Sequence, residues 1–131
     1  MTQEDKQLLL EDLSTRLPYG VKVTTTNPAA EFGVMSGISI KGKISVSTKD
    51  ADIVFECTEV KPYLRPMDSM TREENKEYYK TFRAESYGRG YVYVESVKSF
   101  DWLNAHHFDY RGLIHKGLAI EVTEDNNPYK S

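Results

Sequence analysis

Residue types that commonly do chemistry are concentrated in the segment WLNAHHFDYRGL, residues 102–113. His106, His107 and Asp109 are side chains of the kinds that bind metal ions or transfer protons. Two histidines on a helix share one ion when they lie four residues apart, because both rings then lie on one face. These two are adjacent and would point about 100° apart. A metal or acid–base site here would therefore need further ligands from elsewhere in the chain.

Structural roles explain the same segment. Phe100, Leu103 and His107 recur at helical spacing, and Trp102 and His106 form an i, i+4 pair. We therefore expect a helix in which the histidines have packing roles. The metal or acid–base site remains the alternative.

Capping residues predict where the helical pieces begin and end. Ser99 predicts the start of the helix, and Asp109 is expected to cap a second helical turn after it. Gly117 stands where a left-handed residue would end that turn. Thr71, followed three residues later by Glu74, predicts the start of another helix through a capping box.

Cys57 is the single cysteine, so no disulfide can form within the chain. A nucleophilic role would require His106 or His107 as its base. Its place on the strand face that carries Ile53 and Phe55 instead predicts a small buried hydrophobe. The chain also lacks a GxSxG turn, a P-loop and a dinucleotide-binding fingerprint. We therefore expect no cofactor and lean against an enzyme.

The tyrosines are the strongest candidate for a binding surface, since the chain has nine of them. Tyr87, Tyr91 and Tyr93 are expected on one strand face, with Arg83 and Arg89 near them in sequence. Tyrosine is a rigid, amphipathic contact residue that is favoured at recognition surfaces. The alternative is that this face packs under the preceding helix and forms a second, tyrosine-rich core.

The first half of the chain predicts one helix followed by a small sheet. Residues 2–17 place leucines at helical spacing after a cap at Thr2, and from Val21 the hydrophobic period changes to two. Residues 20–60 predict an antiparallel meander, which forms either a small SH3-like barrel or an open sheet packed on the first helix. The two prolines of KPYLRP (61–66) argue against a central strand and predict an extended strap.

The second half predicts a helix from Thr71 to about Arg83 and a strand within YGRGYVYVESV (87–97). The helical corner described above and a short closing strand at 118–122 follow. Residues 123–131 are polar and are expected to fray.

Length and composition fit a single α+β domain over residues 1–131. Its parts are a helix with a β-meander (1–66) and an α/β half (67–131). The net charge of −3 supplies no global basic field, so nucleic acid is not an expected partner. No stretch approaches the roughly 20 apolar residues of a membrane span, and the first residues do not resemble a signal peptide. We expect a cytoplasmic protein with no membrane partner.

Three stretches carry a family resemblance: LPYGVKV (17–23), KPYLRPM with SMTREE (61–74), and HHFDYRGLIHKGLAIE (106–121). They resemble a family of small proteins that is frequent in gut anaerobic bacteria, their prophages and related mobile elements. That family shows LPYGVKV, KPYLRPxSSMT and HFDYRGLIxKGLAxE in this order. Residues 24–60 and 84–101 match it least, and MDSM stands where the family usually has a serine pair. The resemblance implies an accessory protein of a mobile element and no particular activity.

These observations favour a non-enzymatic binding or adaptor protein that engages a protein or small-molecule partner through the tyrosine–arginine face. One alternative is a small hydrolase or metal-dependent enzyme that uses His106, His107 and Asp109. The other is a structural protein whose tyrosines mediate self-association, for example as a homodimer.

Overall fold

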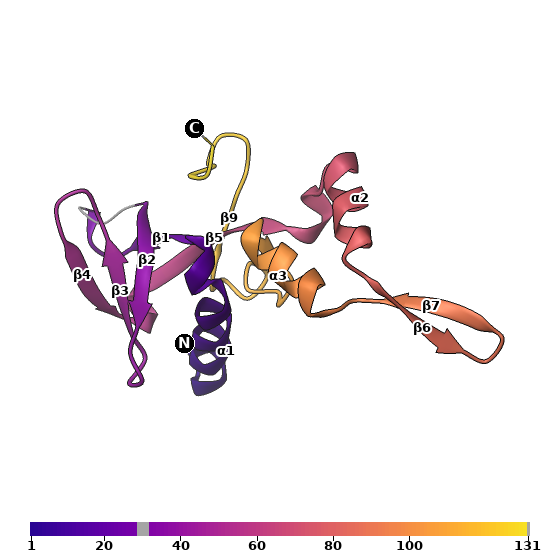
Figure 1. Ribbon diagram of the computed structural model, residues 1–131. Helices are drawn as coiled ribbons and strands as arrows, with labels where there is room; N and C mark the ends of the chain where they lie inside the picture. Colours follow the sequence, from indigo (N-terminus) through magenta and orange to yellow (C-terminus); the bar gives the residue numbers. More distant parts are fainter. Residues whose placement is uncertain (29–31, 131) are drawn as a thin grey trace.

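The structure is a computed structural model that describes residues 1–28 and 32–130 (Figure 1), and it has the expected α+β class. The helices are α1 (Gln3–Arg16), α2 (Arg72–Lys80) and α3 (Val97–Ala105), with 3-10 turns at Leu17–Tyr19, Cys57–Glu59 and Met67–Ser69. The strands are β1 (Lys22–Thr25), β2 (Gly33–Ile38), β3 (Lys43–Ser47), β4 (Asp52–Glu56), β5 (Val60–Pro66), β6 (Arg83–Tyr87), β7 (Gly90–Val94), β8 (Phe108–Asp109) and β9 (Ile120–Glu121).

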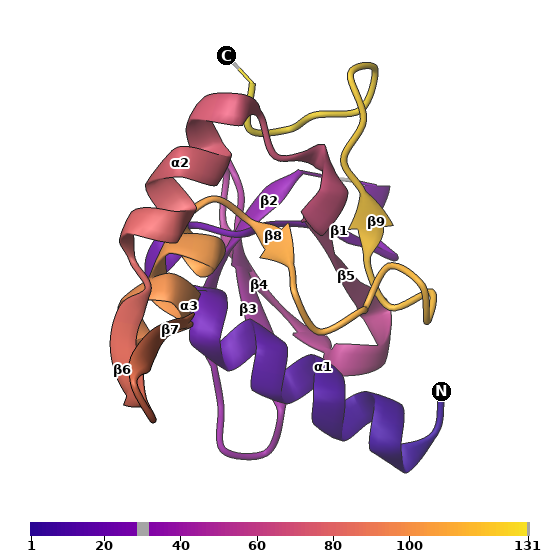
Figure 2. The ribbon, with the colours of Figure 1, turned by 90° about the vertical axis from the view of Figure 1, so that its right-hand side faces the viewer.

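Helix α1 lies across the sheet and supplies part of its core (Figure 2). The Thr2 hydroxyl accepts a hydrogen bond from the Asp5 N–H at 3.0 Å, and the Asp5 side chain completes the capping box. Leu9 and Leu13 are fully buried. Gly20 follows the helical region at φ 67°, a left-handed conformation that glycine adopts readily. The predicted helix is therefore confirmed.

The main sheet has the strand order β4-β3-β2-β1-β5-β8, and β9 also pairs with β5. Strands β1 to β4 form the predicted antiparallel meander. Gly42 lies in the turn between β2 and β3 with φ 81°, a conformation that glycine adopts readily. No pairing among the described strands joins β4 to β5 or β8, so the sheet is open and does not close into a barrel.

The prediction of a strap over residues 61–66 is wrong, because this segment lies in the central strand β5. It pairs antiparallel with β1 and parallel with both β8 and β9. The Arg65 N–H donates to the His107 C=O at 2.8 Å, and the Leu64 C=O accepts from the Val122 N–H at 2.8 Å. Because these two groups belong to one peptide unit, they point to opposite edges of the strand.

The prolines fit this strand because backbone groups alternate between its edges. Pro62 and Pro66 share the edge of Leu64, where the two residues of β9 pair. Proline cannot donate to a ladder, and it is tolerated where its nitrogen faces a sparsely paired edge. The sequence rule therefore holds for one edge of β5, while the other edge pairs first with β1 and then, at Arg65 and Pro66, with β8.

Two hydrophobic clusters form the core of the described chain. The larger lies between α1 and the sheet, and it includes Leu113 and Leu118 from the second half of the sequence. The smaller contains Tyr78, Leu103 and Phe108. Because the first cluster takes residues from both halves, the sequence boundary after residue 66 does not separate the two clusters.

Two helix boundaries differ from the predicted ones. The Thr71 hydroxyl accepts from the Glu74 N–H at 3.1 Å, as predicted, but α2 ends before Arg83, which belongs to β6. Helix α3 begins after Ser96, whereas the sequence predicted a cap at Ser99. The Ser99 hydroxyl instead accepts from the Ser96 N–H at 2.9 Å, in the third position of a capping box. No described helix is long and apolar enough to cross a membrane.

The segment after α3 consists of turns and two short strands, so the predicted second helical piece is absent from the described residues. Its end follows the expected pattern nevertheless. Gly117 has φ 74°, and its N–H donates to the Ile114 C=O at 3.0 Å. The Leu118 N–H donates to the Leu113 C=O at 2.9 Å. This pair of bonds is a Schellman motif around Gly117.

Residues 123–130 are held against the sheet, so the prediction that they fray is wrong. The Tyr129 hydroxyl accepts from the Lys22 N–H at 3.0 Å and donates to the Tyr63 C=O at 2.7 Å. The β1–β5 register would place Lys22 opposite Tyr63. The hydroxyl therefore bridges the two strands at the point where they separate. The sequence signal was one aromatic residue in a polar segment, which did not reveal this contact.

Candidate functional site

Strands β6 and β7 form a hairpin, called the arm below, that projects from the body beyond α2 and α3 (Figure 1). Its register runs from Arg83 opposite Val94 to Tyr87 opposite Gly90. Two residues connect the strands, and the first of them, Gly88, has φ 62°, as a type II′ turn requires. The sequence revealed only the second strand, because RAESY lacks the β-branched residues that mark GYVYV.

The register divides the predicted tyrosine face in two. Tyr91 lies opposite Ser86 and Tyr93 lies opposite Ala84, and directly opposed residues point to the same face. Tyr87 belongs to the other face, because it alternates with Ser86 along β6. The expectation of three tyrosines on one face is therefore wrong: two share a face, and the third is on the reverse side.

The arm is exposed along almost its whole length. Tyr87, Tyr91 and Tyr93 are 77%, 74% and 72% exposed, so α2 does not cover them. The alternative in which they form a second core is wrong. The buried ring in this part of the chain is Tyr78, which packs against Trp102 with ring centroids 5.5 Å apart.

The two candidate arginines lie at opposite ends of the arm. Arg83, at the base, pairs with Glu85 at 2.7 Å, and both side chains are largely exposed. Such a surface pair contributes little stability. Arg89 occupies the turn and makes no ion pair with any described residue. The two charges do not form one patch with the tyrosines.

The base of the arm is anchored to α2 and α3. Glu95 follows β7 directly, and its carboxylate accepts a hydrogen bond from the Tyr78 hydroxyl. Thr81 lies just before β6, and its C=O accepts from the Ser96 hydroxyl at 2.7 Å. The Thr81 hydroxyl donates to the Ser99 hydroxyl at 2.8 Å. Burial, together with the Glu95 contact, raises the pKa of Tyr78 above its ordinary value. Both ends of the arm are thus fixed to the body.

The alternative site, formed by the histidines and Asp109, is engaged in structural contacts. The His106 ring stacks on Trp102 with centroids 4.0 Å apart, and its Nδ1 lies 2.9 Å from the Trp102 C=O. Asp109 accepts from the Leu113 and Ile114 N–H groups, both at 2.9 Å. Both carboxylate oxygens therefore cap the turn that follows, which is the role expected of Asp109.

His107 lies apart from His106. It has φ 63°, and its ring stacks on Tyr129. Its Nδ1 is buried and has no hydrogen-bond partner within the part of the chain that the structure describes. Burial, with a smaller effect from the Arg16 charge, lowers the pKa of His107 to about 4. Within the described residues no group of three or more His, Cys, Asp and Glu side chains is placed to hold a metal ion.

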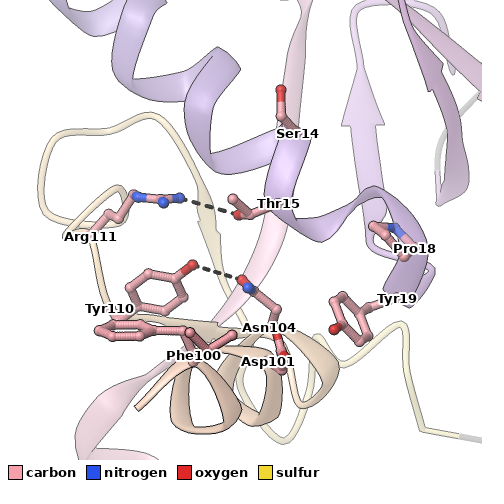
Figure 3. A pocket seen from close by; sticks show the side chains of 10 residues that line it. Ser14, Thr15, Pro18, Tyr19, Phe100, Asp101, Asn104, Tyr110 and Arg111 are labelled. Atoms are coloured by element: carbon pink, nitrogen blue, oxygen red, sulfur yellow. Dashed lines mark hydrogen bonds between the residues drawn. The ribbon is translucent and has the colours of Figure 1, made fainter. Parts of the chain in front are cut away.

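A cleft of about 740 Å³ lies between the end of α1 and α3 (Figure 3). Its walls include Phe100 and Tyr110, whose rings lie 5.4 Å apart. The Tyr110 hydroxyl donates to Asn104 Oδ1 at 2.9 Å, and Arg111 Nη1 donates to Thr15 Oγ1 at 3.3 Å (Figure 3). Because these polar groups satisfy one another, the cleft is better explained as a seam between packed elements than as a ligand site.

A buried ion cluster beside this cleft was not predicted. Asp12 and Arg16 are fully buried, with Arg16 Nε 2.7 Å from Asp12 Oδ2. Arg16 Nη2 also donates to the Phe108 C=O at 2.7 Å, and Arg111 Nη1 approaches Asp12 Oδ1 at 3.3 Å. The i, i+4 spacing of Asp12 and Arg16 was the available signal, but such pairs usually lie on exposed helix surfaces.

Comparisons of the chain with protein-family models, with curated proteins and with solved structures found no match. The functional interpretation of the arm therefore depends on its own geometry and chemistry.

Proposed function

We propose that this chain is a non-enzymatic binding or adaptor protein whose arm docks on a partner protein. The observation that carries the proposal is the exposure of the arm, whose two faces and outer edges meet solvent. An isolated two-stranded hairpin is only marginally stable in water. A partner protein that covers the arm would explain why the chain extends these strands away from its core.

The shape and composition of the arm favour a protein over a small molecule. Small-molecule sites are concave and enclose most of the ligand, whereas the arm is a projecting ribbon. Tyr91 and Tyr93 offer one contact face, and Tyr87 with Val92 offers the other. Tyrosine supplies large contact area with few rotatable bonds, which suits a protein interface.

The resemblance to proteins of prophages and mobile elements supports a narrower proposal. We place the protein among the accessory proteins of such elements, acting in the cytoplasm of the bacterial host. Its partner is then a protein of the host or of the element itself. The enzyme alternative has less support, because His106, His107 and Asp109 have separate structural contacts.

Capture from a lysate of the native host tests the proposal. The tagged full chain is compared with a Tyr91→Ala/Tyr93→Ala variant and with Tyr79→Ala as a control, since Tyr79 is a 64% exposed tyrosine outside the arm. We expect a stoichiometric protein to be recovered with the wild type and the control and lost with the arm variant. Melting of the arm variant should be nearly unchanged, because exposed side chains contribute little.

Two outcomes would contradict the proposal. The first is that gentle capture of the wild-type chain recovers no stoichiometric partner protein. Alternatively, the arm variant retains the partner as well as the Tyr79→Ala control does, which would place the docking surface elsewhere.

A further inference from the structure

We infer that the outer edge of β7 pairs with β7 of a second copy of this chain, antiparallel, to give a four-stranded sheet made of two arms. The inference rests on the proposed function, in which the arm is the docking element, and it identifies one partner of that element.

The register of the arm determines which backbone groups face outward. In a hairpin with a two-residue turn, the pair that flanks the turn, here Tyr87 and Gly90, is hydrogen-bonded, and such pairs alternate along the ladder. Gly90 and Val92 therefore direct their N–H and C=O groups toward β6, while Tyr91 and Tyr93 direct theirs away from it. Since β7 pairs with no other described strand, these four outward groups are unpaired.

The edge of β7 lacks the features that usually prevent strand pairing. Natural edge strands carry charged residues, proline or bulges. Strand β7, GYVYV, has no charge and no proline, and its register with β6 has no bulge. Valine and tyrosine also favour strands. Strand β6 carries Arg83 and Glu85, so the β7 edge is the better pairing surface.

An antiparallel pairing centred on Val92 uses all four outward groups. It places Tyr91 opposite Tyr93 of the second copy as a hydrogen-bonded pair, and it places the two Val92 residues opposite each other. Directly opposed residues share a face, so the four tyrosines of the two arms form one aromatic surface. Aromatic cross-strand pairs of this kind are favourable.

The same register is complementary in charge. It brings Arg89, in the turn of one arm, level with Glu95 at the base of the other, and the two-fold axis repeats this pair. Both residues are exposed, and Glu95 has a second carboxylate oxygen beside the one that accepts from the Tyr78 hydroxyl. An unrelated strand would have no reason to match these two positions, so the charge pattern favours a second copy as the occupant.

Sedimentation velocity of the full chain over a range of concentrations tests the inference. We expect a species of twice the 15.0 kDa mass of one chain. Tyr91→Pro removes an outward N–H without removing a bond of the arm, and it should give a monomer. Ser86→Pro is the matched control, because Ser86 lies directly opposite Tyr91 and its N–H faces outward from β6. This control should remain dimeric.

Charge variants and hydrogen exchange provide independent tests. Arg89→Glu should raise the dimer dissociation constant about tenfold at low salt, whereas Arg89→Lys should leave it nearly unchanged. If proline unfolds the arm, wild-type hydrogen exchange still decides: the Tyr91 and Tyr93 amides should become protected as concentration rises. A monomeric wild type, equal dissociation by both proline variants while their arms remain folded, or no concentration-dependent protection in the wild type would overturn the inference.

The failures of the two proposals are distinguishable. A monomeric chain that still captures a host protein through its arm would overturn only the pairing of two copies. A dimer that Tyr91→Pro dissociates, but that captures no other protein, would support the pairing and contradict the proposed docking on a different partner.

Discussion

The rings of His107 and Tyr129 stack face to face, with centroids 3.7 Å apart and planes 8° apart. His107 has φ 63°, a conformation that few residues other than glycine adopt. Tyr129 bridges the backbones of Lys22 and Tyr63. The stack therefore joins the corner after α3 to the sheet, and loss of either ring should weaken both regions.

Removal of the Tyr129 hydroxyl should lower the free energy of unfolding. Tyr129→Phe leaves the Lys22 N–H and the Tyr63 C=O without their shared partner, at a cost of about 1–2 kcal/mol. Tyr129→Ala also removes a packed ring and should cost about 3 kcal/mol or more. Urea denaturation measures both values, with Tyr87→Phe as an exposed control. A Tyr129→Phe variant as stable as the control would show that the bridge does not contribute.

The buried His107 should make stability depend on pH. Its pKa falls from 6.5 to about 4 on folding, so between these values the unfolded chain binds more protons than the folded one. Stability should therefore fall as the pH drops through this window. Thermal melting at about pH 7 and about pH 5 measures the effect. Glu74, whose pKa folding lowers from 4.5 to about 2, makes stability depend on pH only below about pH 4.5, so it does not contribute between these two values.

The control for this prediction is His107→Asn, which cannot titrate and tolerates a positive φ better than most residues. His106 and His115 remain in both proteins. The variant should lose less stability than the wild type between the two pH values. An equal loss in both proteins would assign the pH dependence to other groups.

Loss of the Asp109 cap should destabilise the turn that follows it. Asp109→Ala removes the acceptor of the Leu113 and Ile114 N–H groups and should cost on the order of 1 kcal/mol. Asp101→Ala, an exposed change on α3, should cost much less. Chemical denaturation compares the two. Unchanged stability of Asp109→Ala together with lost partner binding would instead assign Asp109 to a functional site.

The buried Asp12–Arg16 pair should be sensitive to the loss of one partner. Asp12→Ala leaves the fully buried Arg16 without its counter-charge and should cost about 3–5 kcal/mol. The double change Asp12→Leu/Arg16→Met removes both charges and should recover much of that loss. Urea denaturation measures both variants. A mild effect of Asp12→Ala would show that Arg16 finds another partner or reaches water.

Local signals in the sequence predicted local structure well. The caps at Thr2 and Thr71 and the bonds around Gly117 all depend on residues within a few positions of one another. The Trp102–His106 pair was also apparent from its spacing. Such contacts depend on backbone geometry between residues close together in the chain, so a single sequence is enough to predict them.

Contacts between distant segments could not be predicted in this way. The rule that excludes proline from central strands failed for β5, because it does not say which edge each proline faces. Tyr87 lies on the reverse face because it belongs to β6, and the sequence of β6 has only a weak preference for the strand conformation. Tyr129 became important through Lys22 and Tyr63, which are far from it in the chain.

The position of β5 between partners from both halves has a consequence for biosynthesis. A nascent chain that has passed residue 66 can pair β5 with β1, but β8 and β9 have not yet been translated. The Lys22–Tyr129 hydrogen bond spans 107 positions, and contacts of such long range slow folding. Until residues 108–129 leave the ribosome, β5 retains an unpaired edge, the kind of surface on which nascent proteins misassemble. Translation speed and chaperone access are therefore expected to affect the yield of folded protein.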